Sequence, residues 1–177
     1  MNVSEYIVQE LIKRGVTHVF TLQGGYSMYL NDSIGHSALK PIYMLTESGA
    51  AFAAAGWAKY TGKMGVCVIT SGLAQTNALS GVASAYSDYL PMMVISGDIN
   101  SDLITKRETN HLRQGGQQDV PIIRIAETIT KSIYLLTSST FVKRYMNELI
   151  SEAMCSPRGP VWLNIPLDIQ KEEITND

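Results

Sequence analysis

Short apolar runs alternate with helical stretches along this chain, and this alternation constrains the fold more than any other feature. The runs typical of strands cover residues 18–22, 41–46, 65–70, 91–96, 130–136 and 161–165. Helices are predicted between them and at the N-terminus, over residues 3–14, 26–37, 48–60, 74–86 and 140–154. This order is typical of a sheet covered by helices on both faces. We therefore predict a doubly wound α/β fold with a mainly parallel, six-stranded sheet.

The composition is that of one ordinary globular domain. The chain has 177 residues, of which 45% are hydrophobic and 17% charged, with a formal net charge of −2. We expect one domain over residues 1–170, followed by the start of a linker or a solvated tail over 171–177. The scattered charges and the lack of a long apolar run predict a cytoplasmic protein without nucleic-acid or membrane partners. The two cysteines lack metal-ligand spacing and are expected as free thiols.

Ligands of parallel sheets bind at the carboxyl ends of the strands, so the residues that follow each strand are site candidates. Four such places stand out: Gln23-Gly24-Gly25, Glu47-Ser48-Gly49, Ser71-Gly72 and Gly97-Asp98. Residues 97–128 are expected to form a long loop, which is a site candidate on length alone. The glycine motifs of dinucleotide-binding and phosphate-binding loops are absent from the sequence, which ranks a flavodoxin-like nucleotide binder last.

Glu47 is the most informative candidate, because it follows an apolar strand directly and precedes a helix of small apolar residues. Two interpretations stay open from the local sequence. Glu47 is either a helix N-terminal carboxylate, favoured by the helix dipole, or a carboxyl group in an apolar cleft that exchanges a proton with a ligand nitrogen. Asn77 is equally open between a ligand contact and a solvated helix residue. His111 is the one histidine in the predicted loop. It is either a site residue or an ordinary surface residue.

Several motifs occur in a fixed order that resembles one family. They are residues 19–25 (VFTLQGG), 46–56 (TESGAAFAAAG), 65–72 (GVCVITSG) with Thr76-Asn77, 91–98 (PMMVISGD), Gln118-Asp119, 129–131 (ITK) and 159–170 (GPVWLNIPLDIQ). Together they resemble the N-terminal, pyrimidine-binding domain of thiamine-diphosphate enzymes of the acetolactate synthase type. The resemblance covers nearly the whole chain.

The resemblance implies a role for each matching residue. A glutamate that matches Glu47 binds the pyrimidine nitrogen N1′ of thiamine diphosphate and activates the cofactor. The residues implied to border the pyrimidine are Leu22, Gln23, Gly24 and Gly25 on one side, and Leu73 and Asn77 on the other. Gln118 is implied to face the substrate, and His111 is the second residue expected there. The implied reaction is decarboxylation of a 2-oxo acid such as pyruvate, followed by transfer to a second carbonyl compound.

The chain departs from the family pattern at several positions near the expected substrate loop. The family often has proline at the positions of Gln23 and Leu73, glycine at Ala74, histidine at Thr46, glutamate at Asp119 and aspartate at Pro121. These changes make cofactor binding a firmer expectation than the acetolactate reaction itself. Glu47 is intact.

The 177 residues hold no Gly-Asp-Gly motif of the family's diphosphate-binding domain, so Mg²⁺ and the diphosphate are expected to bind to another domain of the same or a second chain. We expect a homo-oligomer, and FAD is possible in a complete enzyme. Two alternatives remain. The chain is one subunit of a split 2-oxo acid decarboxylase, or a non-catalytic dimerisation or regulatory module of the thiamine type.

Overall fold

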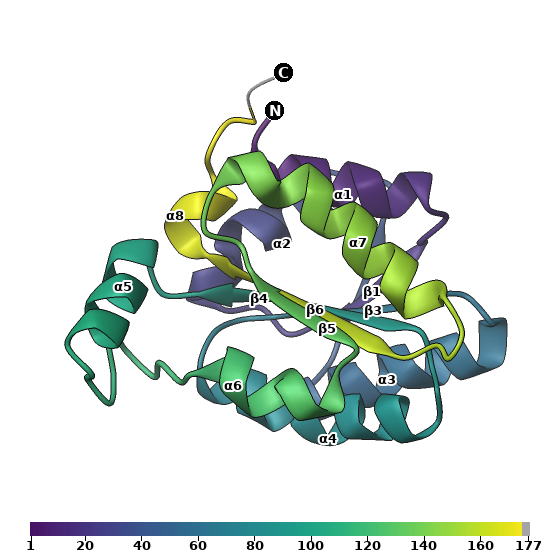
Figure 1. Ribbon diagram of the computed structural model, residues 1–177. Coiled ribbons are helices and arrows are strands. Elements are labelled where there is room, and N and C mark those ends of the chain that lie inside the picture. Colours follow the sequence, from purple (N-terminus) through teal and green to yellow (C-terminus); the bar gives the residue numbers. More distant parts are fainter. Residues whose placement is uncertain (175–177) are drawn as a thin grey trace.

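A single six-stranded sheet forms the centre of the molecule in a computed structural model that describes residues 1–174 (Figure 1). The strand order is β2-β1-β3-β4-β6-β5, and every neighbouring pair is parallel. This confirms the predicted α/β class, with a fully parallel sheet. The strands are β1 (His18–Thr21), β2 (Lys40–Tyr43), β3 (Gly65–Ile69), β4 (Met92–Asp98), β5 (Ser132–Leu135) and β6 (Pro160–Pro166).

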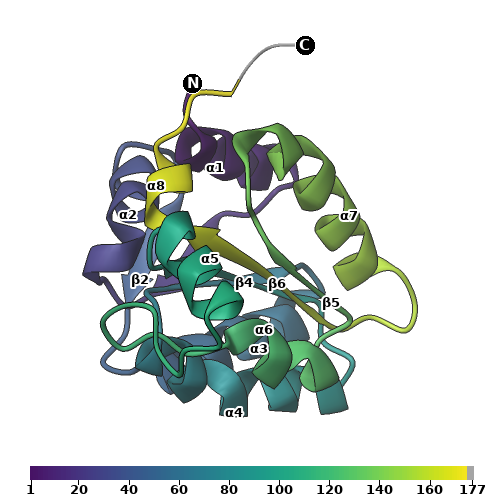
Figure 2. The same cartoon turned by 60° about the vertical axis from the view of Figure 1, so that its left-hand side comes forward.

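Helices cover both faces of the sheet, and Figure 2 shows the two layers from a second direction. One layer consists of α1 (Val3–Lys13), α2 (Met28–Gly35), α7 (Val142–Met154) and α8 (Leu167–Gln170). The other consists of α3 (Glu47–Thr61), α4 (Leu73–Ser87) and α6 (Ile122–Ala126). Short 3₁₀ turns are η1 (Gly25–Ser27), η2 (Glu127–Ile129) and η3 (Ser139–Phe141).

The central strand β3 is apolar throughout because each of its sides packs on a different helical layer. Val66 and Val68 of β3 belong to the core beneath α1, α2 and α7. Cys67 and Ile69 of the same strand belong to the core beneath α3 and α4. Successive side chains point to opposite faces of a strand, so a strand buried on both faces has no polar alternation. This explains why the apolar runs gave the strand positions.

α3 and α4 pack closely, because small residues line their contact. The buried positions of α3 are all alanines: Ala50, Ala51, Ala54, Ala55 and Ala58. A Cβ atom added to Gly81 of α4 would lie 2.5 Å from Ala51 Cβ. The two helices therefore form one closely packed unit.

The prediction of a long loop over residues 97–128 was wrong in part. The segment contains α5 (Ser101–Thr109) as well as α6 and a part of η2. α5 has few apolar residues, and its start is held from far along the chain: Asp168 accepts hydrogen bonds from the Ser101 amide at 2.9 Å and from its hydroxyl at 2.5 Å. Local apolar periodicity could not predict such a helix.

The two ends of the described chain lie side by side. Asn2 and Glu173 form an antiparallel bridge, and the Ile174 amide donates to the Met1 carbonyl at 3.0 Å. Part of the predicted tail, residues 171–174, is therefore attached to the N-terminus, and residues 175–177 lie outside the described residues. No helix within residues 1–174 is both long and apolar enough to cross a bilayer.

Candidate functional site

The turns after β1 and β3 meet at the carboxyl edge of the sheet. The Tyr26 amide donates to Thr70 Oγ1 at 3.2 Å, which joins the two turns. A Cβ atom at Gly24 would lie 2.5 Å from the Thr70 side chain, so this position requires glycine. Gly25, by contrast, has nothing within 4 Å of an added Cβ atom. The glycine pair thus serves two purposes: Gly24 allows close packing, and Gly25 leaves bare backbone facing open space.

Glu47 lies at this edge as the first residue of α3, and Asn77 of α4 holds its carboxylate. Asn77 Nδ2 donates to Glu47 Oε2 at 2.6 Å. The N-cap of α3 is Thr46, whose Oγ1 accepts from the Gly49 amide at 3.0 Å. Since Thr46 supplies the cap, Glu47 is not needed for it. Asn77, one of the residues left open by sequence, is a direct neighbour of Glu47.

The Glu47 carboxylate stands above the apolar core between α3, α4 and β3. Burial raises the pKa of the Cys67 thiol well above its usual range, and the negative charge of Glu47 raises that pKa further. Glu47 itself is half-buried and forms no ion pair within the described part of the chain. A carboxylate with one hydrogen-bond donor and no cation keeps a free oxygen, Oε1, for a further partner.

Leu73, at the start of α4, gives this edge an exposed apolar surface, with 56% of its area accessible. The preceding Gly72 has a left-handed backbone (φ 68°), and a Cβ atom there would collide with the Gln118 carbonyl. Gln118 is itself left-handed (φ 57°) and exposed. The Gln118 segment is therefore seated directly on the turn that starts α4.

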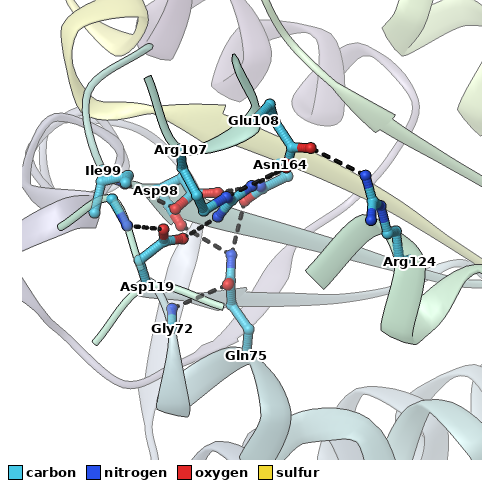
Figure 3. Close-up of polar contacts among 11 residues, drawn as sticks. Gly72, Gln75, Asp98, Ile99, Arg107, Glu108, Asp119, Arg124 and Asn164 are labelled. Atoms are coloured by element: carbon cyan, nitrogen blue, oxygen red, sulfur yellow. Dashed lines mark hydrogen bonds and ion pairs between the residues drawn. The ribbon is translucent and has the colours of Figure 1, made fainter. Parts of the chain in front are cut away.

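A buried polar network behind these turns was missed by the sequence analysis (Figure 3). Gln75 Nε2 donates to Ser96 Oγ at 3.0 Å, to Asn164 Oδ1 at 2.8 Å and to the Gly97 carbonyl at 3.1 Å. Gln75 Oε1 accepts from the Gly72 amide at 2.9 Å. The signal for this network was present as Ser96 and Asn164, two polar residues inside apolar strands that lie opposite each other in the β4–β6 register.

Two aspartates extend this network towards α5. Asn164 Nδ2 donates to Asp98, and burial raises the pKa of Asp98 to about 6. Asp119, whose side chain is fully buried, forms an ion pair with Arg107 of α5 and also accepts from the Gly115 amide at 2.9 Å. The segment that carries Gln118 is thus fixed from inside by Asp119.

Comparison with known proteins identifies the family of the chain. Residues 1–123 match the family described as "Thiamine pyrophosphate enzyme, N-terminal TPP binding domain". The chain belongs to the thiamine pyrophosphate enzymes. Chloroplastic acetolactate synthase 2 of Nicotiana tabacum is 33% identical over 98% of this chain, and the acetolactate synthase isozyme 2 large subunit of Escherichia coli K12 is 34% identical over 96%. The chain spans 25% and 30% of the lengths of these two relatives.

This thiamine pyrophosphate enzyme domain is acetolactate synthase-like, and its carboxyl edge suits the flat half of the cofactor. The free oxygen of Glu47 is an acceptor, Gly25 presents open backbone, and Leu73 offers an apolar surface to a ring. Leu22 and Gln23 continue the Gly24-Gly25 turn at the same edge. The roles of these residues toward a cofactor, like that of Gln118 toward a substrate, stay predictions.

Two cavities contain residues that the resemblance assigns to the site, and Glu47 is in the wall of neither. One of about 580 Å³ is lined by Gln23 and Gly24 together with residues of α2 and Tyr43. The other, of about 290 Å³, contains His111. The structure thus places His111 with arginines of α5 and α6, not beside Glu47 and Asn77. Among residues 1–174, no three His, Cys, Asp or Glu side chains are grouped to hold a metal ion.

Proposed function

We propose that this chain supplies the pyrimidine-binding half of an active site that decarboxylates a 2-oxo acid, such as pyruvate, and transfers the product to a second carbonyl compound. The observation that carries the proposal is the Glu47–Asn77 pair at the ligand edge of the sheet, in which a half-buried carboxylate has no cationic partner among residues 1–174. Thiamine diphosphate would supply the electron sink for this chemistry.

Glu47 is the proposed acid–base residue, and its surroundings support that role. Asn77 binds Oε2, and Oε1 would be the oxygen that meets a ring nitrogen such as N1′. A carboxylate with no cation nearby can accept and return a proton more readily than one held in an ion pair. Leu73 and Gly25 would border the flat ring, with Leu22, Gln23 and Gly24 beside it.

The remaining half of the site is proposed to come from another domain, of this or a second chain, that holds Mg²⁺ and the diphosphate. The α3–α4 pair supports such an association, because it exposes three large apolar side chains, those of Phe52, Leu73 and Tyr86. Exposed apolar surface of this kind favours an interaction with another domain. We propose a homo-oligomer in the cytoplasm, in which FAD would bind to yet another domain if it is used.

The test compares the full-length protein with its Glu47→Gln variant, assayed with Mg²⁺, thiamine diphosphate and pyruvate. We expect turnover to fall about 100-fold or more, as is typical for removal of a general acid–base group. Hydrogen exchange at the reactive carbon of the cofactor, followed by NMR, should slow to a similar degree.

Glu5→Gln is the matched control, because Glu5 is the first-turn carboxylate of α1 on the opposite face of the sheet. Its loss should affect the stability of α1 and leave turnover intact. Undiminished turnover in Glu47→Gln would contradict the assigned role and favour a non-catalytic module.

A further inference from the structure

Three arginines converge on a cavity beside the predicted substrate segment. The cavity of about 290 Å³ lies between α5, the loop after it and α6, and we call it the arginine cavity. Arg107 comes from α5, Arg113 from the loop and Arg124 from α6. His111 completes the basic lining. Its volume suits a small group and not an extended ligand.

Two of these arginines already hold a carboxylate between them. Glu108 Oε1 accepts from Arg107 Nη2 at 2.9 Å, and Glu108 Oε2 accepts from Arg124 Nη2 at 3.0 Å, a contact visible at the right of Figure 3. The hydrogen bond from Arg107 lowers the pKa of Glu108, and the charges of Arg107, Arg124 and His111 lower it further. Arg107 and Arg124 thus lie close enough to share one oxyanion, and Glu108 is the oxyanion that they share in this structure.

The positive charge of the cavity is not fully balanced. Arg107 is neutralised by the buried Asp119, and Glu108 is shared with Arg124. Arg113 is exposed and has no acidic partner within residues 1–174. Three guanidinium groups thus face two carboxylates, which leaves one positive charge before any protonation of His111. A ligand with negative charge would meet a free arginine there.

The arginine cavity and the Gln118 segment are connected by direct contacts and by sequence. Arg107 binds Asp119, the residue next to Gln118, and Pro121 forms part of the cavity wall. Gln118 itself is seated on the Gly72 turn at the proposed cofactor edge. One loop therefore contributes to both places.

We propose that the arginine cavity binds a small oxyanion, and that this is the second anionic group of the 2-oxo acid or of its acceptor. The group would be a carboxylate, phosphate, phosphonate or sulfonate, since the planar fork of arginine binds all of these. The substrate part of this inference rests on the proposed function. The binding of an oxyanion does not, and it can be measured without turnover.

The first experiment titrates the protein with inorganic phosphate, at constant ionic strength set with chloride, and follows binding by NMR or calorimetry. We expect saturable binding that weakens about tenfold in Arg113→Gln and in Arg124→Gln, the loss expected for one charged hydrogen bond. Both side chains are exposed, so the variants should fold. Arg144→Gln is the control, because Arg144 is an exposed arginine on α7. Absence of binding, or equal affinity in all four proteins, would overturn the site.

The second experiment identifies the source of the oxyanion in the full-length protein. It compares kcat/KM for a 2-oxo acid with a second carboxylate, 2-oxoglutarate, and for pyruvate. If the substrate supplies the oxyanion, the ratio of the two values should fall about tenfold in Arg113→Gln and stay constant in Arg144→Gln. An unchanged ratio in a variant that has lost phosphate binding would overturn the substrate assignment and identify a free anion as ligand. Failure of the proposed function is recognised separately, because Glu47→Gln would then keep its turnover.

Discussion

Two groups of polar side chains lie at the same edge of the sheet, and they differ in how completely they are satisfied. The Glu47–Asn77 pair is half exposed and joined by one hydrogen bond, and no side chain of residues 1–174 forms an ion pair with Glu47. The network around Gln75 and Asn164 is buried, and Gln75 alone takes part in four hydrogen bonds. The two groups share α4, since Gln75 and Asn77 are two residues apart.

Polar groups whose hydrogen bonds are all made inside the protein serve the structure, whereas those with an unused hydrogen-bonding atom are available to a ligand. Buried polar groups are stable only when their hydrogen bonds are made inside the protein, and the network meets this condition. The Glu47 carboxylate keeps a free oxygen at the surface, which costs little in water and leaves it available to a ligand. Variants at the two places should therefore respond in opposite ways, with stability changing at the network and function changing at Glu47.

The largest effect on stability is expected at the buried ion pair. Asp119→Asn leaves the Arg107 guanidinium without its buried partner, and should lower the free energy of unfolding by about 3–4 kcal/mol. Urea denaturation followed by circular dichroism measures this. Asp88→Asn removes the exposed pair with Lys59 and should cost less than about 1 kcal/mol. Equal losses in the two variants would show that burial does not distinguish these pairs.

The next effect depends on pH. The pKa of Asp98 is about 6 in the folded protein, compared with 3.8 for the unperturbed group, so the folded state binds its proton more tightly. Stability from Asp98 is then greatest below about pH 4 and is lost as pH rises to about 6. The difference of about 2 pKa units corresponds to about 3 kcal/mol.

Asp98→Asn measures that contribution directly. The free energy of unfolding of the parent, minus that of the variant, should fall by about 2 kcal/mol between pH 4 and pH 7, because pH 4 already lies above the unperturbed pKa. Other carboxyl groups contribute equally to both proteins and cancel in the subtraction. A difference that stays constant over this range would contradict the raised pKa.

The smallest expected change in the free energy of unfolding comes from comparing two variants within α4. Gln75→Ala removes one partner from several buried groups and should lower the free energy of unfolding by about 2–3 kcal/mol. Asn77→Ala removes an exposed hydrogen bond and should cost at most about 1 kcal/mol, so the two differ by about 2 kcal/mol. In turnover the order should reverse, because only Asn77 orients Glu47. Equal losses of unfolding free energy in Gln75→Ala and Asn77→Ala would contradict the distinction between the buried network and the Glu47–Asn77 pair.

The sequence predicted the sheet well and the buried network poorly, for one physical reason. β3 is apolar on both sides, and a strand of this kind is recognisable from its own residues. α5 starts where Asp168 binds Ser101, 67 residues away, and no local pattern contains that contact. The same holds for Gln75 and Asn164, which meet across 89 residues.

Glu47 shows what the sequence could and could not give at the site. The order of motifs singled it out, while its local context allowed a helix cap as well. In the structure, Thr46 is the N-cap of α3, and Asn77 is the hydrogen-bond partner of Glu47. The arginine cavity had no sequence signal, because its lining comes from α5, the loop after it and α6, which only the fold brings together.

The close contact of Gly81 with Ala51 has a consequence for Glu47 and Asn77, although neither residue touches it. Ala51 and Gly81 each lie four residues, about one helical turn, after Glu47 and Asn77, so their contact sets the gap between the two helices beneath that pair. Even one added methyl group at Gly81 would open that gap. The reach of the carboxylate is therefore governed by alanines and a glycine that carry no chemistry of their own.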